Sequence, residues 1–146
     1  MNGQKVCFIL PEGGSELASH GAYLVEFART VAENAPVRII VERASEKLPN
    51  VSIPHFQRQP LHFFEIFYLC ICARTQRYDH FYVHYSYTGA LAAKLVTLIA
   101  GGRVFYWNCG MMWLFGKKRF LRFLLRHVAD RLVTGNETMR QGYHAH

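Results

Sequence analysis

The sequence predicts one α/β domain, a Rossmann-like parallel sheet flanked by helices. Short apolar runs rich in β-branched residues alternate along the chain with longer stretches of helical periodicity. The runs are too apolar for strands with one solvated face, so helices are expected on both faces of the sheet. A chain of 146 residues, 51% of them hydrophobic, has room for one core of this kind.

A glycine-rich loop separates the first predicted strand from the first predicted helix. The apolar run at residues 6–10 predicts the strand, which stops at the turn-forming segment 11–15. Apolar side chains at three- and four-residue spacings predict a helix over residues 17–31. The amides of Gly13 and Gly14 suit a phosphate or a sugar hydroxyl at the helix start, although two glycines also suit a plain turn. The loop lacks the dinucleotide-binding pattern GxGxxG.

The middle of the chain continues the alternation. Residues 37–41 predict a second strand, and residues 51–56 predict a weaker third strand that contains Pro54. Residues 61–76 read as a largely apolar helix, which is either packed on all sides or exposes apolar surface. The remaining predicted elements are a strand at 80–84, a helix at 88–100 closed by Gly101-Gly102, and a strand at 103–107.

Positive charge is concentrated in the last third of the chain. Residues 100–146 contain eight Lys and Arg against two Asp and Glu, within a formal net charge of +7. Residues 117–131 predict an amphipathic helix, followed by a short strand at 132–134. The apolar stripe of this helix is Leu121, Leu124, Leu125 and Val128, the basic face is Arg119, Arg122 and Arg126, and Phe123 lies at the edge of the basic face.

The basic helix has two interpretations. Arginines beside an exposed aromatic are typical of a helix that lies on an anionic membrane surface. An ordinary solvated basic face has the same pattern. We expect no nucleic-acid partner, because the sequence contains no helix-turn-helix, zinc-finger or RNA-binding signature.

Polar residues follow two predicted strands, at the edge where parallel sheets bind their ligands. His84 and Ser86 come at the end of strand 80–84, and Asn108 and Cys109 follow strand 103–107. His84 can orient a hydroxyl or act as a base, or it can be a satisfied residue of the core. The aromatic and methionine-rich loop at 107–113 suits a sugar ring, an acyl chain or a partner domain, or it packs beneath the last helix.

Other features argue against metal sites, disulfides and membrane spans. The pair His144 and His146 lacks the further ligands that a metal site needs. The apolar stretches are interrupted before they reach the ~20 residues of a spanning helix, and the opening apolar run is too short for a signal peptide. The cysteines lie in apolar segments without framework spacing, which predicts reduced thiols in a cytoplasmic protein; they are Cys7, Cys70, Cys72 and Cys109.

The order of these motifs resembles the amino-terminal half of family 4 glycosyltransferases, which have the GT-B fold. The resemblance spans nearly all of the chain: a first strand, a proline-containing Gly-Gly loop and a long helix come first. His84 with Ser86 and Gly89 then precede an Ala- and Leu-rich helix, and a strand ending at a glycine follows at 103–107. The family often has a histidine before that glycine, whereas this chain has Asn108-Cys109 before Gly110.

The resemblance implies a reaction that needs a second domain. Family members bind the nucleotide-sugar mainly through a carboxyl-terminal domain with two glutamates, and residues 1–146 contain no such domain. The implied activity is transfer of a sugar from a nucleotide-sugar donor to a glycan or lipid-linked acceptor, without a metal. Residues 1–146 would form the acceptor-side domain, inactive until the carboxyl-terminal domain joins it in cis or in trans.

The implied sites are a ligand cleft and a membrane-facing surface. The cleft would be lined by Gly13, Gly14, His84, Ser86, Asn108 and Cys109, and the membrane surface would consist of Arg119, Arg122, Phe123 and Arg126. No catalytic residue is assigned. The protein would be cytoplasmic and peripheral on the inner face of the membrane.

Two other classes of function are open to this sequence. One is a non-catalytic α/β adaptor or half-domain that binds anionic membrane through the basic helix. The other is a stand-alone nucleotide-binding α/β protein, which would need a complete phosphate loop that the sequence does not contain. Salt-sensitive vesicle binding would favour the first class, and tight nucleotide binding by this chain alone would favour the second.

Overall fold

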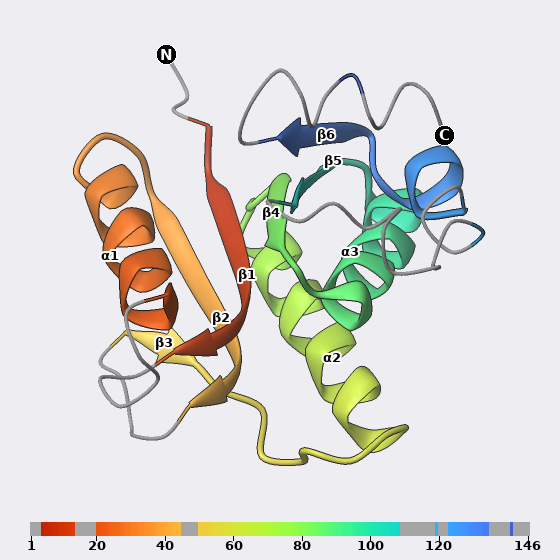
Figure 1. Ribbon diagram of the computed structural model, residues 1–146, viewed down its shortest axis with the longest axis horizontal. Coiled ribbons are helices and arrows are strands. Elements are labelled where there is room, and N and C mark those ends of the chain that lie inside the picture. The colour runs from red at the N-terminus through yellow and green to blue at the C-terminus, as the bar shows by residue number, and fades with distance from the viewer. Residues whose placement is uncertain are drawn as a thin grey trace.

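Strands and helices alternate along the chain as the apolar periodicity predicts (Figure 1). The structure, a computed structural model, describes residues 4–13, 20–44, 50–108, 119, 123–134 and 141. The elements are β1 (Val6–Gly13), α1 (His20–Ala32), β2 (Val37–Ala44), β3 (Val51–Ser52), α2 (Leu61–Thr75), β4 (His80–His84), α3 (Tyr87–Ala100), β5 (Arg103–Asn108), the π-helical turn η2 (Leu124–Val128) and β6 (Arg131–Thr134).

The first strand lies inside one parallel sheet. The strand order is β3-β2-β1-β4-β5-β6 across the described residues, and every neighbouring pair is parallel. The chain therefore moves from β1 outward to β2 and β3, and then crosses back over β1 to continue from β4 in the other direction. Such a reversal creates a crevice at the carboxyl ends of β1 and β4, where open α/β sheets bind their ligands.

Helices cover both faces of this sheet, as Figure 1 shows for α1 on one side and for α2 and α3 on the other. Successive residues of a strand point to opposite faces. Phe8 and Leu10 of β1 accordingly join the core under α1, whereas Cys7 and Ile9 join the core under α2 and α3. Burial on both faces explains why the strands are apolar at nearly every position.

The expected fold class, a Rossmann-like parallel sheet flanked by helices, is confirmed. The helices expected at 61–76 and 88–100 are α2 and α3. Gly101 closes α3 with φ 74°, and its N–H donates a 2.9 Å hydrogen bond to the Thr97 carbonyl. The third strand is shorter than expected, because only Val51 and Ser52 pair with β2.

The helix expected over 117–131 is wrong at its carboxyl end. Helical backbone stops at Val128, Ala129 has an extended ψ of 124°, and Arg131 begins β6. The Asp130 carboxylate holds this turn against β5, because it accepts the Val104 N–H at 2.7 Å. The burial of Leu124 and Val128 is as predicted, and Arg119, Phe123 and Arg126 are exposed. Leu121, Arg122 and the side chain of Leu125 lie outside the described part.

Candidate functional site at the carboxyl edge of the sheet

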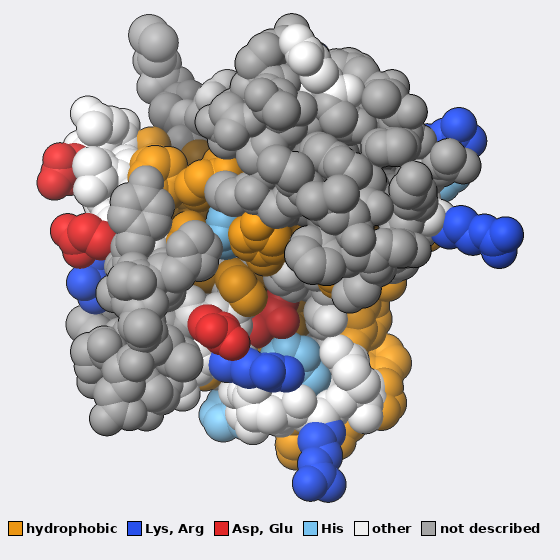
Figure 2. All heavy atoms as spheres, in the orientation of Figure 1, with side chains coloured by type: hydrophobic (Ala, Val, Ile, Leu, Met, Phe, Trp, Pro, Cys, Tyr) orange, Lys and Arg blue, Asp and Glu red, His pale blue; other side chains and the backbone are white. Residues whose placement is uncertain are grey.

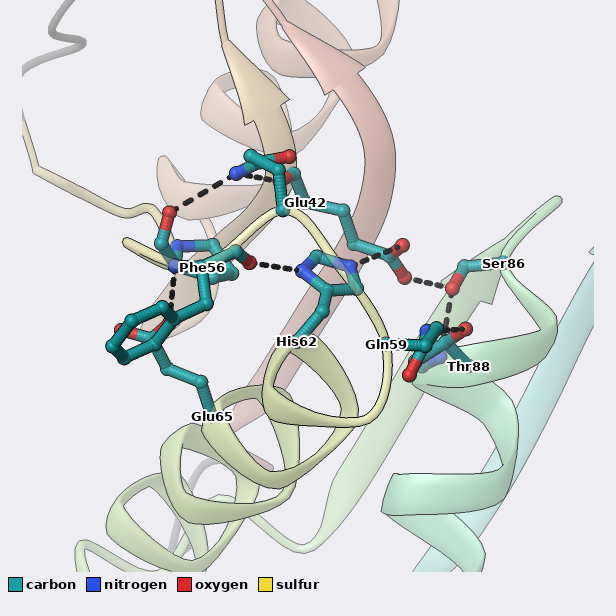
Figure 3. Close-up of polar contacts among 10 residues, drawn as sticks. Glu42, Phe56, Gln59, His62, Glu65, Ser86 and Thr88 are labelled. Atoms are coloured by element: carbon teal, nitrogen blue, oxygen red, sulfur yellow. Dashed lines mark hydrogen bonds and ion pairs between the residues drawn. The ribbon is translucent and has the colours of Figure 1, made fainter.

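Three polar side chains meet at the crevice created by the strand order (Figure 3). Glu42 lies near the carboxyl end of β2, His62 lies in the first turn of α2, and Ser86 lies between β4 and α3. They come from three separate segments of the chain and meet beside the amino-terminus of α3. We call Glu42, His62 and Ser86 the polar cluster.

The Glu42 carboxylate is the centre of the polar cluster. Its Oε1 accepts a hydrogen bond from the Ser86 hydroxyl, and its Oε2 lies 3.2 Å from Nε2 of His62. Ser86 Oγ in turn accepts the N–H of Gly89 at 2.7 Å, which caps the amino-terminus of α3. The carboxylate therefore connects the end of β2 to the beginnings of both α2 and α3.

The contacts of His62 determine where its protons lie. Nδ1 is 2.8 Å from the Phe56 carbonyl oxygen, which can only accept, so Nδ1 carries a hydrogen and donates. Nε2 and Oε2 of Glu42 then need one further proton between them. The pair is either a histidinium with a carboxylate or a neutral histidine with a carboxylic acid, and it can accept or release a proton at this point.

Burial controls the electrostatics of the pair. The side chains of Glu42 and His62 are only 13% and 6% exposed. Desolvation raises the pKa of the Glu42 carboxyl above its ordinary value of 4.5, while the hydrogen bond and positive charge of His62 and the Gly89 N–H oppose that rise. The carboxyl is therefore easier to protonate than an exposed glutamate.

Gly89 allows α3 to approach the polar cluster closely. A Cβ atom at this position would lie 2.5 Å from Cγ2 of Ile9 and 2.8 Å from Ser86 Oγ. It would also lie 3.1 Å from Oε1 of Glu42. Only glycine fits here without displacement, so the amino-terminus of α3, the positive end of its dipole, packs directly against Ile9 of β1.

The loop before α2 is fastened beside the polar cluster. Gln57 donates to the Glu42 carbonyl at 3.2 Å, and Gln59 donates to the Thr88 hydroxyl at 3.3 Å. The Phe56 N–H donates to Glu65 at 2.9 Å. These bonds hold residues 56–59 between the end of β2 and the first turn of α3, as Figure 3 shows.

His84 is fully buried at the end of β4. Its ring makes edge-on contacts with the ring of Trp107 on β5 at 4.5 Å and with the ring of Tyr85 at 4.7 Å. Tyr85 has φ 53°, a left-handed conformation that is uncommon outside glycine and turns the chain from β4 toward Ser86. His84 supports this edge from within the aromatic layer, and its contact with a ligand stays a prediction.

The residues predicted for the cleft fall at one edge of the sheet where the structure describes them. Gly13 ends β1, Ser86 follows β4, and Asn108 ends β5. Gly14 and Cys109, predicted beside them, lie outside the described residues. Among the described residues of this predicted set, Ser86 belongs to the polar cluster, and ligand binding by the set stays a prediction.

Sequence reasoning missed Glu42 and His62. Glu42 interrupts an apolar strand near its carboxyl end, and an acidic residue at that position of a parallel strand is a signal for a site. His62 gave no such signal, because its partners Phe56 and Glu42 are brought to it only by the folded loop.

The described part of the chain contains neither a candidate metal-ligand cluster nor a candidate membrane span. No three His, Cys, Asp or Glu side chains there lie close enough together to hold a metal ion. None of the described helices is long and apolar enough to cross a membrane.

These features define a class, the Rossmann-like α/β domains with a polar crevice where the strand order reverses. The chain is similar in structure to a protein assigned as a UDP-N-acetylglucosamine 2-epimerase from Listeria monocytogenes, with a TM-score of 0.64, 17% identity, and coverage of 99% of this chain and 43% of that one. It is also similar to the UDP-GlcNAc 2-epimerase from Methanocaldococcus jannaschii, with a TM-score of 0.65, 14% identity, and coverage of 97% and 42%.

The similarity establishes the fold. The chain spans less than half the length of either solved structure. No protein-family model matches the chain, and no curated protein matches it either.

Proposed function

We propose that this chain is the amino-terminal domain of a nucleotide-sugar enzyme, specifically of a glycosyltransferase that moves a sugar from a nucleotide-sugar donor to a glycan or lipid-linked acceptor. The observation that carries the proposal is the polar cluster at the carboxyl edge of the sheet, where such sheets bind ligands. The names of the two structural neighbours, both UDP-GlcNAc 2-epimerases, support the nucleotide-sugar class.

In this proposal the domain supplies one wall of a cleft. The start of α3 offers a positive helix end to a phosphate or a sugar hydroxyl, and Glu42 and His62 hold Ser86 and the loop at 56–59 in place. The burial of Glu42 and His62 makes them positioning residues in this scheme. The facing wall belongs to a carboxyl-terminal domain, so the isolated chain is inactive. No metal takes part.

Ligand binding tests the proposal. The longest protein that the gene encodes and residues 1–146 alone would each be titrated with UDP-, GDP- and ADP-sugars by calorimetry. We expect the longer protein to bind at least one donor and the chain alone to bind it far more weakly. Failure of the longer protein to bind any nucleotide-sugar would overturn the assignment.

Product analysis separates sugar transfer from the reaction named for the structural neighbours. A transferase releases nucleotide from the bound donor when an acceptor is present. A 2-epimerase instead converts UDP-GlcNAc to its C2 epimer, with no acceptor required. Accumulation of the epimer in acceptor-free reactions, followed by proton NMR, would replace the transferase proposal with an epimerase.

A membrane-binding adaptor is the second candidate, and the exposed side chains of Phe123 and Arg126 favour it. An aromatic beside arginine suits shallow insertion into an anionic surface. Cosedimentation with phosphatidylglycerol vesicles should then fall with salt, and charge reversal at Arg119, Arg122 and Arg126 should abolish it. Equal binding to neutral vesicles would contradict this role.

A further inference from the structure

The outward surfaces of α2 and α3 carry two rows of exposed apolar side chains. The row on α2 is Leu61, Phe64, Tyr68 and Ile71, and the row on α3 is Leu91, Leu95, Leu98 and Ile99. We call these eight residues the α2–α3 face. Their exposed fractions range from 38% at Leu95 to 84% at Ile99. Figure 2 shows apolar side chains along the margin of the molecule where these helices lie.

The two rows form one continuous surface. Phe64 and Leu91, together with Phe123, Leu124 and Val128 around η2, line a hollow of about 370 Å³ at the amino-terminal ends of the two helices. Ile71 and Ile99 line a second hollow of about 220 Å³ between the carboxyl-terminal ends. Both helices return antiparallel to the strands, so the face runs from the carboxyl edge of the sheet to its amino edge.

The area of this face matches a protein interface. Fully accessible side chains of this size expose on the order of 200 Å² each, so the eight partly exposed residues present roughly 800 Å². The largest apolar patch on a typical monomer is about 300–600 Å². A standard interface buries about 800 Å² on each partner.

The charged side chains of the two helices are engaged within the domain, although Arg74 also lines the second hollow beside Ile71 and Ile99. Lys94 pairs with Asp130 at 2.7 Å, and Arg74 donates to the Ala100 carbonyl at 2.7 Å. Glu65 accepts the Phe56 N–H at 2.9 Å. A helix that lies on a membrane presents free lysines and arginines beside its apolar surface. None of the eight residues of the face is charged, and Arg74 is held by main-chain carbonyls, so the face fits a protein partner better than a lipid headgroup.

Symmetry favours a second copy of the chain as that partner. In a two-fold interface the same patch lies on both subunits, and residues near the axis meet their own copies. A charged residue there would repel itself, whereas an uncharged apolar row is complementary to itself. A domain that closes over the carboxyl edge would not reach Leu98 and Ile99, which lie near the amino edge beside Gly101.

We propose that the α2–α3 face binds the same face of a second copy of this chain, which makes the protein a homodimer. The four helices, two from each copy, form the contact. This inference does not rest on the proposed function, because dimerisation is measured as a change in molecular mass and requires no ligand.

Sedimentation velocity from roughly 1 to 100 μM, a range that spans moderate affinities, tests the dimer. We expect the chain to form dimers, and we expect Ile99→Lys and Tyr68→Lys each to weaken dimerisation at least 100-fold while keeping the far-ultraviolet circular dichroism of the wild type. Phe56→Lys is the matched control, since Phe56 is also 54% exposed but lies off the face. It should dimerise as the wild type does.

Three results would overturn the proposal. The first is a wild-type chain that stays monomeric throughout this range, and the second is an equal loss of dimer in Phe56→Lys and Ile99→Lys. The third is binding of the wild type to neutral or anionic vesicles that Ile99→Lys abolishes, which would make a membrane the occupant. Amide hydrogen exchange tests the interface without any substitution. In the wild type, residues 61–75 and 87–100 should exchange more slowly at high protein concentration than at low concentration.

Discussion

Replacing Gly89 with alanine is expected to destabilise the domain, although alanine favours helices. The new Cβ would lie 2.5 Å from Cγ2 of Ile9, and carbon atoms normally pack at about 3.5–4.0 Å, so α3 or β1 must move by roughly 1 Å. Overpacking of this kind costs about 1–3 kcal/mol. Displacing Ser86 Oγ also weakens the cap of α3, which contributes about 1 kcal/mol. Helix propensity returns at most about 1 kcal/mol.

The net expectation is a loss of about 1–3 kcal/mol, which lowers Tm by roughly 4 °C for each kcal/mol in a domain of this size. Urea and thermal unfolding followed by circular dichroism at fixed protein concentration would measure it. Ser86→Ala supplies the second arm of a double-mutant cycle, because it removes the hydroxyl that the new methyl meets. Gly89→Ala should cost less in that background, but the contact with Ile9 should keep it destabilising. A Gly89→Ala protein as stable as the wild type would refute the close approach of α3.

Three further predictions follow from the contacts of single residues. The pKa of the Glu42 carboxyl is raised in the fold, so wild-type stability should fall as pH rises from about 4.5 through that raised value. Glu42→Gln should lack this slope. If urea unfolding from pH 4 to 7 gives the wild type and Glu42→Gln the same dependence of stability on pH, the prediction is contradicted. Burial raises the pKa of the Asp130 carboxyl, but the hydrogen bonds from Lys94 and the Val104 N–H outweigh burial and bring that pKa below 3.8. The charged carboxylate therefore stabilises the fold at neutral pH, and this contribution is lost as pH falls below 3.8. Asp130→Asn should cost about 1–3 kcal/mol at neutral pH and less in acid. An equal loss at pH 3 and pH 7 would show that the charge is unimportant. Burial raises the pKa of the Cys7 thiol to about 12, so iodoacetamide at pH 8 should leave Cys7 unmodified until urea unfolds the protein, as mass spectrometry can check.

The sheet was predictable because its determinants are local. Runs such as residues 6–10 and 103–107 are apolar at nearly every position, which identifies them as buried strands. The expected stop at 11–15 was wrong in part, because β1 continues past Pro11 to Gly13, where Glu12 and Gly13 pair with Arg43 and Ala44 of β2. The start of α2 directly after Pro60 follows from the same local rules. The sequence could not decide whether α2 is buried on all sides or exposes apolar residues, because an apolar helix is compatible with either arrangement. In the structure Ile66 is buried and Tyr68 is exposed.

The polar cluster was only partly predictable because its partners are distant in sequence. Ser86 was recognised by its place after a strand and before a helix. Its hydrogen bond to Glu42 and the contact of Glu42 with His62 depend on how β2, β4 and α2 are arranged in space. The predicted end of the helix at 117–131 was wrong for the same reason, because the contact that fixes it, between Asp130 and the Val104 N–H of β5, joins residues distant in sequence.

The central place of β1 has a consequence for synthesis on the ribosome. Cys7 pairs on one side with Arg38 and on the other with Phe81, so one neighbour of β1 emerges long before the other. A nascent chain that has formed β1, α1 and β2 still exposes Cys7, Ile9 and Ile40, whose face is covered only by α2 and α3. An unpaired edge and an open apolar face invite aggregation. Until β4 and α3 have left the exit tunnel, this strand edge and this apolar face remain open to incorrect pairing.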